Sequence, residues 1–179
     1  MSDPNIEFLD IGSGSDQRSI AVAAQAGEAP GIFWLSGFKS DMRGTKAQAL
    51  AAWALNSNRA CVRFDYSGHG QSAGEFLDGT MTRWLEESVA VFEHFCRGPQ
   101  VVVGSSMGGW LALLLAREIK QRRAAAPLAG LVLIAPAVDF TEVLMWSKLP
   151  AKIKRELETK GYGSVRHSMN RMDTRSPGR

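Results

Sequence analysis

The sequence predicts a three-layer α/β/α fold, in which a mostly parallel, doubly wound sheet is covered by helices on both faces. Short apolar runs alternate along the chain with segments of helical period, the order expected of strands joined by crossover helices. These runs contain few polar residues, as in strands that are buried on both faces. With 179 residues, 45% of them hydrophobic, the chain is long enough for one buried core. We therefore expect one main domain.

The first half of the chain is expected to open with a hairpin. Strands at residues 6–11 and 19–24 flank a short segment of glycine, serine and aspartate, whose residues suit a tight connection. An apolar strand follows at residues 31–35. A helix is predicted over residues 45–55, because its alanines and leucines recur at helical spacing and Thr45 can cap its first turn.

The second half continues with strands and helices in alternation. A strand at residues 60–64 precedes a helix from about residue 82 to residue 96, whose apolar side chains share one face. The strand at residues 101–103 leads directly into a helix over residues 107–119, and a further strand follows at residues 131–134. Because a helix separates each strand from the next, parallel pairing is expected.

Beyond Pro136 the pattern changes. Residues 140–146 and 151–160 are predicted to form two helices, the second strongly charged, which resemble a lid more than a core. From Gly161 onward no apolar period remains. We therefore expect an α/β core over residues 1–136, a lid-like helical segment over 137–160 and a disordered basic tail over 161–179.

The net charge of +3 arises in the last residues of the chain. From Tyr162 onward four arginines stand against one aspartate, so the preceding part is neutral as a whole. A charge excess confined to the tail is not the general basic footprint of a nucleic-acid-binding protein. We therefore expect no nucleic-acid partner. No segment approaches the roughly 20 apolar residues of a membrane span, so no membrane span is expected either.

Two cysteines are too few for a disulfide framework. Cys61 lies in an apolar strand and Cys96 lies near the end of a predicted helix, so we expect buried free thiols. The first ten residues have neither a basic start nor a long apolar stretch. These observations predict a protein of a reducing compartment, most simply the cytoplasm.

One segment, Gly104-Ser105-Ser106-Met107-Gly108-Gly109, fits the pattern G-x-S-x-G. The pattern also occurs by chance in glycine-rich loops, but here a strand precedes it directly and a helix follows it directly. In a nucleophile elbow the serine occupies a strained strand-to-helix turn, and the two glycines let the chain fold back without a Cβ collision. Ser106 has the required register between Gly104 and Gly108, whereas Ser105 does not. Ser106 is therefore the candidate nucleophile.

A carbonyl that Ser106 attacks would need amide donors for its oxygen. The backbone N–H of Met107, at the start of the following helix, is one candidate. In an elbow architecture the second donor comes from the loop after the third strand, here Leu35-Ser36-Gly37-Phe38. We expect the backbone N–H of Phe38 to be that donor. The alternative is a plain turn with an exposed aromatic side chain.

Three strings resemble those of the α/β-hydrolase superfamily: Leu35–Phe38, Arg63–Ser72 and Gly104–Trp110. Gly44–Ala47, together with Phe64–Gly68 within the second of these strings, is similar to its branch of mitochondrial acyl-protein (palmitoyl-protein) thioesterases. The resemblance implies a serine acyl-transfer reaction: Ser106 attacks a thioester or ester carbonyl, a histidine takes its proton, and water resolves the acyl-enzyme. It implies no metal or organic cofactor, and a substrate that is a small molecule or an acylated protein.

The acid and the histidine that complete such a triad follow the serine along the chain. After Ser106 the only histidine is His167, and the aspartates are Asp139 and Asp173. Asp139 is better explained as a helix cap, and the other two lie in the predicted tail. No convincing partner for the serine follows from these positions.

Neither earlier histidine is expected to be the base. His69 lies in a glycine-rich loop after a strand, and the resemblance implies that it structures this loop rather than acting as the base. His94 falls on a predicted solvent face. We therefore expect a C-terminally truncated hydrolase fold that lacks its last strands, acid and histidine, with residues 131–134 as an uncovered apolar edge. Three functions fit: a serine hydrolase impaired by these losses, a catalytically inactive acyl-binding module, and a non-functional gene fragment.

Overall fold

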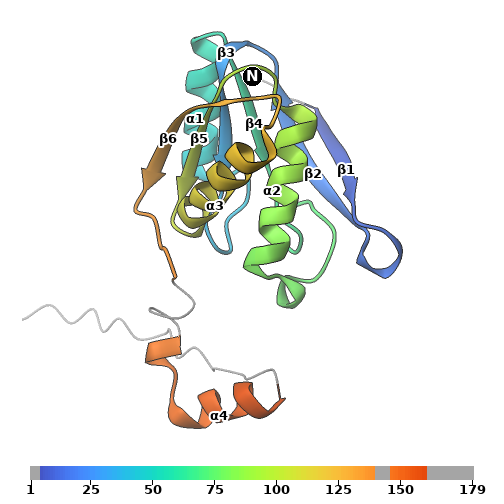
Figure 1. The fold of residues 1–179 in the computed structure, drawn as a ribbon, viewed down its shortest axis with the longest axis vertical. Coiled ribbons are helices and arrows are strands. Elements are labelled where there is room, and N and C mark those ends of the chain that lie inside the picture. Colours follow the sequence, from blue (N-terminus) through green and yellow to red (C-terminus); the bar gives the residue numbers. More distant parts are fainter. Residues whose placement is uncertain (1–4, 140–145, 161–179) are drawn as a thin grey trace, which may run out of the picture. The chain divides into compact units, whose positions relative to one another are not determined.

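The computed structural model describes residues 5–139 and 146–160. The chain divides into two compact units, Met1–Val138 and Asp139–Arg179. The described part of the first unit is a six-stranded sheet with helices packed on it (Figure 1). Its elements in chain order are β1 (Ile6–Ile11), η1 (Gly14–Asp16), β2 (Arg18–Gln25), β3 (Glu28–Leu35), α1 (Thr45–Asn56), β4 (Arg59–Phe64), η2 (Phe76–Asp78), α2 (Met81–Phe95), β5 (Gln100–Ser105), α3 (Met107–Arg122) and β6 (Leu128–Ile134).

The strand order is β1-β2-β4-β3-β5-β6. β1 and β2 form the predicted antiparallel hairpin, and β2 pairs antiparallel with β4. The pairs β4 with β3, β3 with β5, and β5 with β6 are all parallel. The predicted α/β sheet, mostly parallel, is therefore confirmed. Because parallel strands point the same way, the loops that follow β3, β4 and β5 leave the sheet at one edge.

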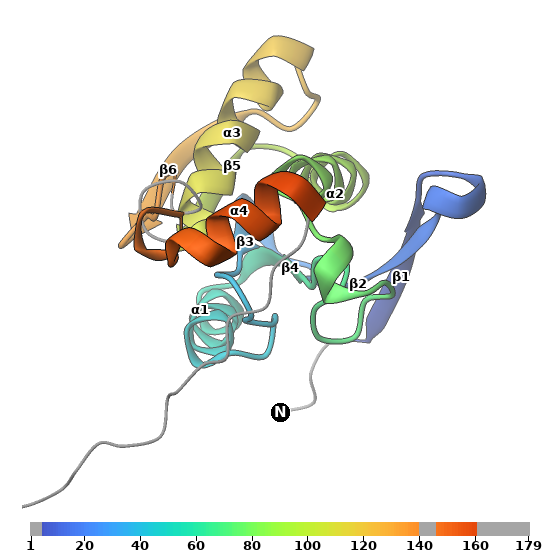
Figure 2. The same ribbon diagram turned by 90° about the horizontal axis from the view of Figure 1, so that it is seen from below.

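Helices cover both faces of the sheet, as predicted. Figure 2 shows α1 on one face and α2 and α3 on the other. Side chains of β3 alternate between these layers: Ile32 and Trp34 pack in a cluster with alanines of α1, whereas the ring of Phe33 lies 5.2 Å from that of Phe92 in α2. A strand covered in this way needs apolar residues on both sides, which explains its continuous apolar run.

Several element boundaries differ from the prediction by a few residues, and two of these differences have a clear cause. β3 begins at Glu28, ahead of the apolar run at residue 31, because Glu28 pairs with Arg59 before a shift of register. Gly44, not Thr45, caps α1, and its carbonyl accepts the amide of Gln48. Apolar spacing carries no information about the polar and glycine residues at the ends of elements, so these positions were predicted wrongly.

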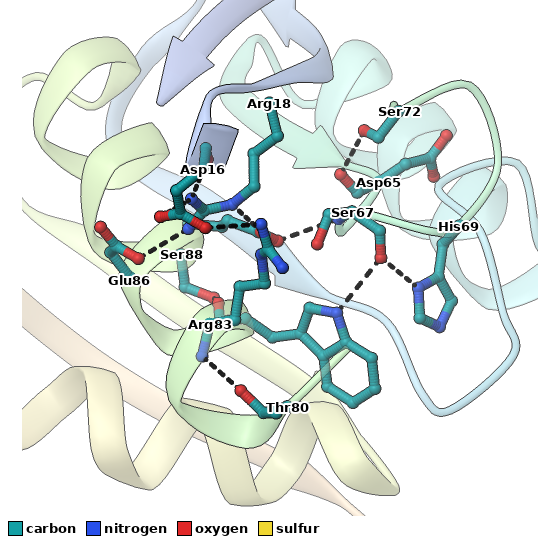
Figure 3. Close-up of polar contacts among 12 residues, drawn as sticks. Asp16, Arg18, Asp65, Ser67, His69, Ser72, Thr80, Arg83, Glu86 and Ser88 are labelled. Carbon is teal, nitrogen blue, oxygen red and sulfur yellow. Dashed lines mark hydrogen bonds and ion pairs between the residues drawn. The ribbon is translucent and has the colours of Figure 1, made fainter. Parts of the chain in front are cut away.

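A cluster of charges joins the hairpin to α2 (Figure 3). Arg18 of β2 donates to Glu87 and to Glu86, each at 2.6 Å. The side chains of Arg18 and Glu87 are 3% and 0% exposed, whereas that of Glu86 is 55% exposed. A buried charge loses its hydration, and only a partner at hydrogen-bond distance offsets that loss. Arg18 and Glu87 therefore depend on each other.

Both cysteines are free and buried, as predicted. Burial raises the pKa of the Cys61 thiol to about 11 and that of the Cys96 thiol to about 12. The thiolate is the reactive form of cysteine, and a raised pKa keeps its population small at neutral pH. The two thiols are core residues rather than nucleophiles.

β6 is the last strand in the sheet order and, among the described strands, pairs only with β5. Val132 and Leu128 on this strand are 46% and 37% exposed. The apolar edge expected at residues 131–134 is thus present in the described part of the chain. Such an edge is a template for pairing with another strand.

The second unit is described at Asp139 and over residues 146–160. It contains η4 (Trp146–Lys148) and α4 (Ala151–Lys160), so the helix predicted over 151–160 is confirmed. Most of the helix expected at 140–146 and the whole tail expected at 161–179 lie outside the described residues. None of the described helices is both long and apolar enough to span a bilayer.

We expect Glu87→Ala to lower the free energy of unfolding by about 3 kcal/mol, because it leaves the buried Arg18 without its main partner. Glu86→Ala is the matched control. It should lower the free energy of unfolding by less than about 1 kcal/mol, because the Glu86 side chain is exposed. Urea denaturation followed by circular dichroism measures both variants. Equal losses would contradict the role assigned to Glu87.

We expect neither cysteine to react with iodoacetamide in the folded protein at pH 8, because both thiols are buried and protonated. Both should react within minutes in denaturant. Mass spectrometry of the intact protein before and after unfolding distinguishes the two states. Comparable labelling of native and unfolded protein would show that the core around Cys61 and Cys96 is open.

Candidate active site

Ser106 occupies the turn between the last residue of β5 and the first residue of α3. Its backbone has φ 55° and ψ −119°, a conformation that costs an L-residue free energy and must be held by its surroundings. Three backbone hydrogen bonds hold it: the Ser106 amide donates to the carbonyl of Ile134, and the Ser106 carbonyl accepts the amides of Gly109 and Ala137. The turn is therefore fixed from both β6 and α3.

The two glycines of the motif have no room for a side chain. A Cβ on Gly104 would lie 2.1 Å from the carbonyl oxygen of Gly108, and a Cβ on Gly108 would lie 2.1 Å from that of Leu35. The start of α3 is thus pressed against both β5 and the end of β3. This contact explains why small residues stand two positions before and two positions after Ser106.

Exposure distinguishes the two adjacent serines. Ser106 is exposed, whereas Ser105 belongs to β5 and is 8% exposed. Ser106 is also the residue at the apex of the turn, as the register argument predicted. Its side chain forms no hydrogen bond that caps α3.

The loop after β3 lies directly beside this serine. A Cβ on Gly37 would come within 3.4 Å of the Ser106 Cβ and within 3.2 Å of the Ser105 carbonyl oxygen. Phe38 follows Gly37, and its ring packs 5.1 Å from Phe76 and 6.3 Å from Trp84. The ring is therefore half-buried rather than exposed, and the role of the Phe38 amide as an oxyanion donor stays a prediction. On the other side of Ser106, the amide of Met107 is the first of α3, which has no intrahelical acceptor.

A cavity of about 270 Å³ opens beside Ser106. Its polar wall residues come from the loop after β3 and the first turn of α1: Ser36, Ser40, Asp41, Thr45 and Lys46. Trp34 adds an apolar face and is otherwise core, since its indole donates to Ser36 Oγ. Polar and apolar side chains thus both line the cavity.

The histidines of the described residues do not contact this serine. Both ring nitrogens of His69 are within hydrogen-bond distance of backbone atoms, Nδ1 of Ser67 O and Nε2 of the Lys39 amide. His94 is exposed on α2, as predicted. His167 and Asp173 lie outside the described residues.

Asp139 was expected to cap a helix, but the residues that such a helix would contain, 140–145, are not described. The backbone of Asp139 itself has φ 54°. No group of three or more His, Cys, Asp and Glu side chains within the described ranges is arranged to hold a metal ion.

Two buried carboxylates near the site were not singled out from the sequence. Asp65 accepts the amides of Met42 and Gln71, at 2.7 and 2.8 Å. Burial raises the pKa of its carboxyl group, and those two hydrogen bonds partly oppose the rise. The second is Glu87, which accepts the Ser67 amide at 2.9 Å. The position of Asp65 directly after a buried strand could have marked it as a candidate site residue. Its contact with Met42, 23 positions away in the chain, could not be predicted from the sequence.

Residues 32–174 match the family described as serine aminopeptidase, S33. The chain belongs to this family of α/β-hydrolases. The human protein named "Palmitoyl-protein thioesterase ABHD10, mitochondrial" is 37% identical over 150 residues, covering 84% of this chain and 47% of the relative. The bovine protein of the same name is 37% identical over 157 residues, covering 88% and 48%. The resemblance to the thioesterase branch is confirmed.

Solved structures of α/β-hydrolases agree with this assignment. A protein of Agrobacterium vitis S4 superposes with a TM-score of 0.85 at 44% identity, over 93% of this chain and 66% of that one. Alpha/beta hydrolase domain-containing protein 10 from mouse superposes with a TM-score of 0.72 at 32% identity, over 88% of this chain and 59% of that one. The chain spans about half the length of the curated relatives it matches.

The relatives correct one expectation. The sequence suggested a cytoplasmic protein, but the curated α/β-hydrolases that it matches are named mitochondrial. The cytoplasmic prediction is therefore wrong. It rested on two unpaired cysteines and on an absent secretion signal, and neither property distinguishes one reducing compartment from another.

In an α/β-hydrolase elbow packed this closely, we expect Gly108→Ala to lower the free energy of unfolding by about 2 kcal/mol or more, because the new Cβ would overlap the Leu35 carbonyl. Gly130→Ala is the control, since a Cβ there would meet only Val101 side-chain atoms at 3.6 Å or more. Thermal unfolding of both variants tests the expectation. A Gly108→Ala protein as stable as the control would contradict the close contact.

Proposed function

We propose that this chain is a serine hydrolase that cleaves carboxyl ester or acyl thioester bonds through an acyl-enzyme on Ser106. The observation that supports it most is the exposed serine at φ 55° between β5 and α3, with the loop after β3 against it. A regular helix or an ordinary loop would not present a hydroxyl and a helical amide together. The family match is consistent with the same chemistry.

The proposed reaction has two steps. Ser106 Oγ attacks the acyl carbonyl carbon, the amides of Met107 and Phe38 donate to the resulting oxyanion, and the alcohol or thiol leaves with a proton. Water then attacks the acyl-serine ester, releasing the carboxylic acid and the free hydroxyl. Both steps need a base that takes a proton from the nucleophile. No metal or organic cofactor takes part in this scheme.

The proposed substrate is an acylated small molecule or an acylated protein. The name of the curated relatives describes a palmitoyl-protein thioesterase, which supports an acyl thioester as one substrate class. The cavity beside Ser106 has both polar side chains and the apolar residues Trp34, Phe38 and Ala47 in its wall, so it suits a substrate with a polar group next to a small apolar one. No nucleic-acid partner is proposed, because the charge excess lies outside the α/β core.

One observation favours the alternative of a catalytically inactive acyl-binding module or a non-functional fragment. Within residues 5–139 and 146–160, His69 is engaged by backbone groups and His94 is exposed on α2. A serine hydroxyl without a base is a poor nucleophile, and loss of a triad member lowers turnover by about 10⁴-fold. The impaired hydrolase and the inactive module differ in whether Ser106 reacts at all.

We expect a fluorophosphonate to label Ser106 of the purified chain, and Ser106→Ala to abolish the labelling. Ser105→Ala is the control. Its labelling rate should stay within about threefold of the wild-type rate, because Ser105 is a buried strand residue. Intact mass and peptide mapping identify the site, and hydrolysis of a short aryl ester and an acyl thioester reports turnover.

Three results are distinguishable in this experiment. Labelling at Ser106 with slow turnover supports the impaired hydrolase. Acyl-ligand binding without labelling, unchanged in Ser106→Ala, supports the inactive module and rejects the proposal. A purified chain that shows no cooperative unfolding supports a non-functional fragment and also rejects it.

A further inference from the structure

The segment that carries the Phe38 amide is a strained turn. The Ser40 amide donates to the Gly37 carbonyl at 3.1 Å, which closes a four-residue turn around Phe38 and Lys39. Lys39 stands at the third position with φ 57°, where glycine is the favoured residue of a type II turn. A lysine in this conformation costs free energy, so contacts from outside the turn must hold it.

His69 supplies the contact to the strained residue. The Lys39 amide donates to Nε2 of His69 at 3.3 Å. The other ring nitrogen, Nδ1, lies 3.2 Å from the Ser67 carbonyl oxygen. Because Nε2 accepts a hydrogen bond from the Lys39 amide, the ring N–H must be at Nδ1, which donates it to the Ser67 carbonyl. His69 is therefore placed to bridge the loop after β4 to the loop after β3.

The ring of His69 is itself fixed from α2 (Figure 3). Its acceptor, the Ser67 carbonyl, also accepts the indole N–H of Trp84 at 3.2 Å. The Ser67 amide donates to the fully buried Glu87 at 2.9 Å. The His69 ring lies edge-on to Trp84 and Phe76, at 5.2 Å from each centroid. With 6% of its surface exposed, His69 has little freedom to turn away from Lys39.

Further contacts join the same two loops on either side of His69. Asp65 accepts the Met42 amide at 2.7 Å, and Arg63 donates to the Met42 carbonyl at 2.8 Å. Tyr66 Oη donates to the Ser36 carbonyl at 3.3 Å. These contacts fix the two ends of the loop after β3. Of the hydrogen bonds named here, the one from Lys39 to His69 reaches the turn itself, where the Phe38 ring also packs against Phe76 and Trp84.

We propose that His69 is a positioning residue, which holds the Phe38 amide at Ser106 by accepting the amide of Lys39. This inference rests on the proposed hydrolase function, because it assigns the purpose of the held turn to oxyanion stabilisation. It gives His69 a role that differs from a catalytic base, since neither ring nitrogen is left to take a proton from Ser106. The proton on Nδ1 is a defined consequence of that role.

The test uses two substitutions that separate the two ring nitrogens. In His69→Gln the new side chain places its amide oxygen near the position of Nε2, so this variant keeps an acceptor for Lys39. In His69→Asn the new side chain is one methylene shorter than that of glutamine, so its amide N–H lies near the position of Nδ1. This variant therefore keeps a donor for the Ser67 carbonyl but no acceptor for the Lys39 amide. His94→Asn, at an exposed histidine, is the matched control. The full chain is used for all of them.

The first readout is nuclear magnetic resonance, which does not depend on activity. In the wild-type protein the ¹⁵N shifts of His69 should show protonated Nδ1 and unprotonated Nε2. Hydrogen exchange of the Lys39 amide should become about tenfold faster in His69→Asn and change less than about threefold in His69→Gln and His94→Asn. The amide of Val102 in β5 reports global stability in the same spectra. Protonated Nε2 in the wild type would overturn the proposal.

The second readout is the labelling of Ser106 by a fluorophosphonate, separated into probe affinity and maximal rate. Misplacing one oxyanion donor should lower the maximal rate about tenfold to 100-fold in His69→Asn and leave the affinity unchanged, with recovery in His69→Gln. An unchanged Lys39 exchange in His69→Asn, or equal effects of the two variants with Val102 unchanged, would reject the positioning role. If His69→Asn does not fold, the proposal is judged by the tautomer of His69 in the wild type and by the Lys39 exchange rate in His69→Gln. A wild-type chain that is never labelled would reject the proposed function, while the exchange data still judge the contact from His69 to Lys39.

Discussion

A contact between backbones that leaves no room for a Cβ atom sets the geometry of the candidate site. Gly104 and Gly108 allow the first turn of α3 to pack against β5 and against the end of β3. With a larger residue at either position, the helix would move away from the sheet and the turn at Ser106 would open. The same contact brings the first turn of α3 close to the end of β3, and the loop after β3 lies beside Ser106. The local strain at Ser106 is held by hydrogen bonds from β6 and α3.

Buried carboxylates hold the loops at this edge of the sheet. Loops that leave a sheet lose the ladder bonds of strands, and their buried amides need other acceptors. Asp65 accepts two such amides and Glu87 accepts a third, while Glu87 also neutralises Arg18 of the hairpin. The charge of each carboxylate is stabilised by the donors around it, and each donor is satisfied by the carboxylate. Hydrogen bonds of Glu87 thereby join the hairpin and the loop after β4 to α2, next to His69.

These features explain how an α/β-hydrolase framework can prepare a serine before any base is considered. The elbow, the helical amide and the loop after β3 all come from residues within β3 to α3. Their positions depend on packing and on buried hydrogen bonds between described residues of the first unit. The acid and base steps of the proposed chemistry require a proton acceptor, which is a separate requirement from this preparation. Preparation and proton transfer are thus distinct contributions to the reaction.

Much of the fold was predictable because its signals are local. Continuous apolar runs predicted the strands, helical spacing predicted the helices, and the glycine pattern around Ser106 predicted the turn at that residue. Element ends at Glu28 and Gly44 were missed because they are polar or glycine residues outside the apolar period. The compartment was predicted wrongly because no physical property of a folded core encodes it.

By itself the sequence determined the α/β class, the order of the elements, the two free thiols and the position of Ser106 between a strand and a helix. Only the tertiary structure decided which residues hold the site. Asp65 meets Met42 across 23 positions of the chain, and Arg18 meets Glu87 across 69. A single polar residue in the sequence has many possible partners, and the choice among them depends on which loops the parallel sheet brings to the same edge.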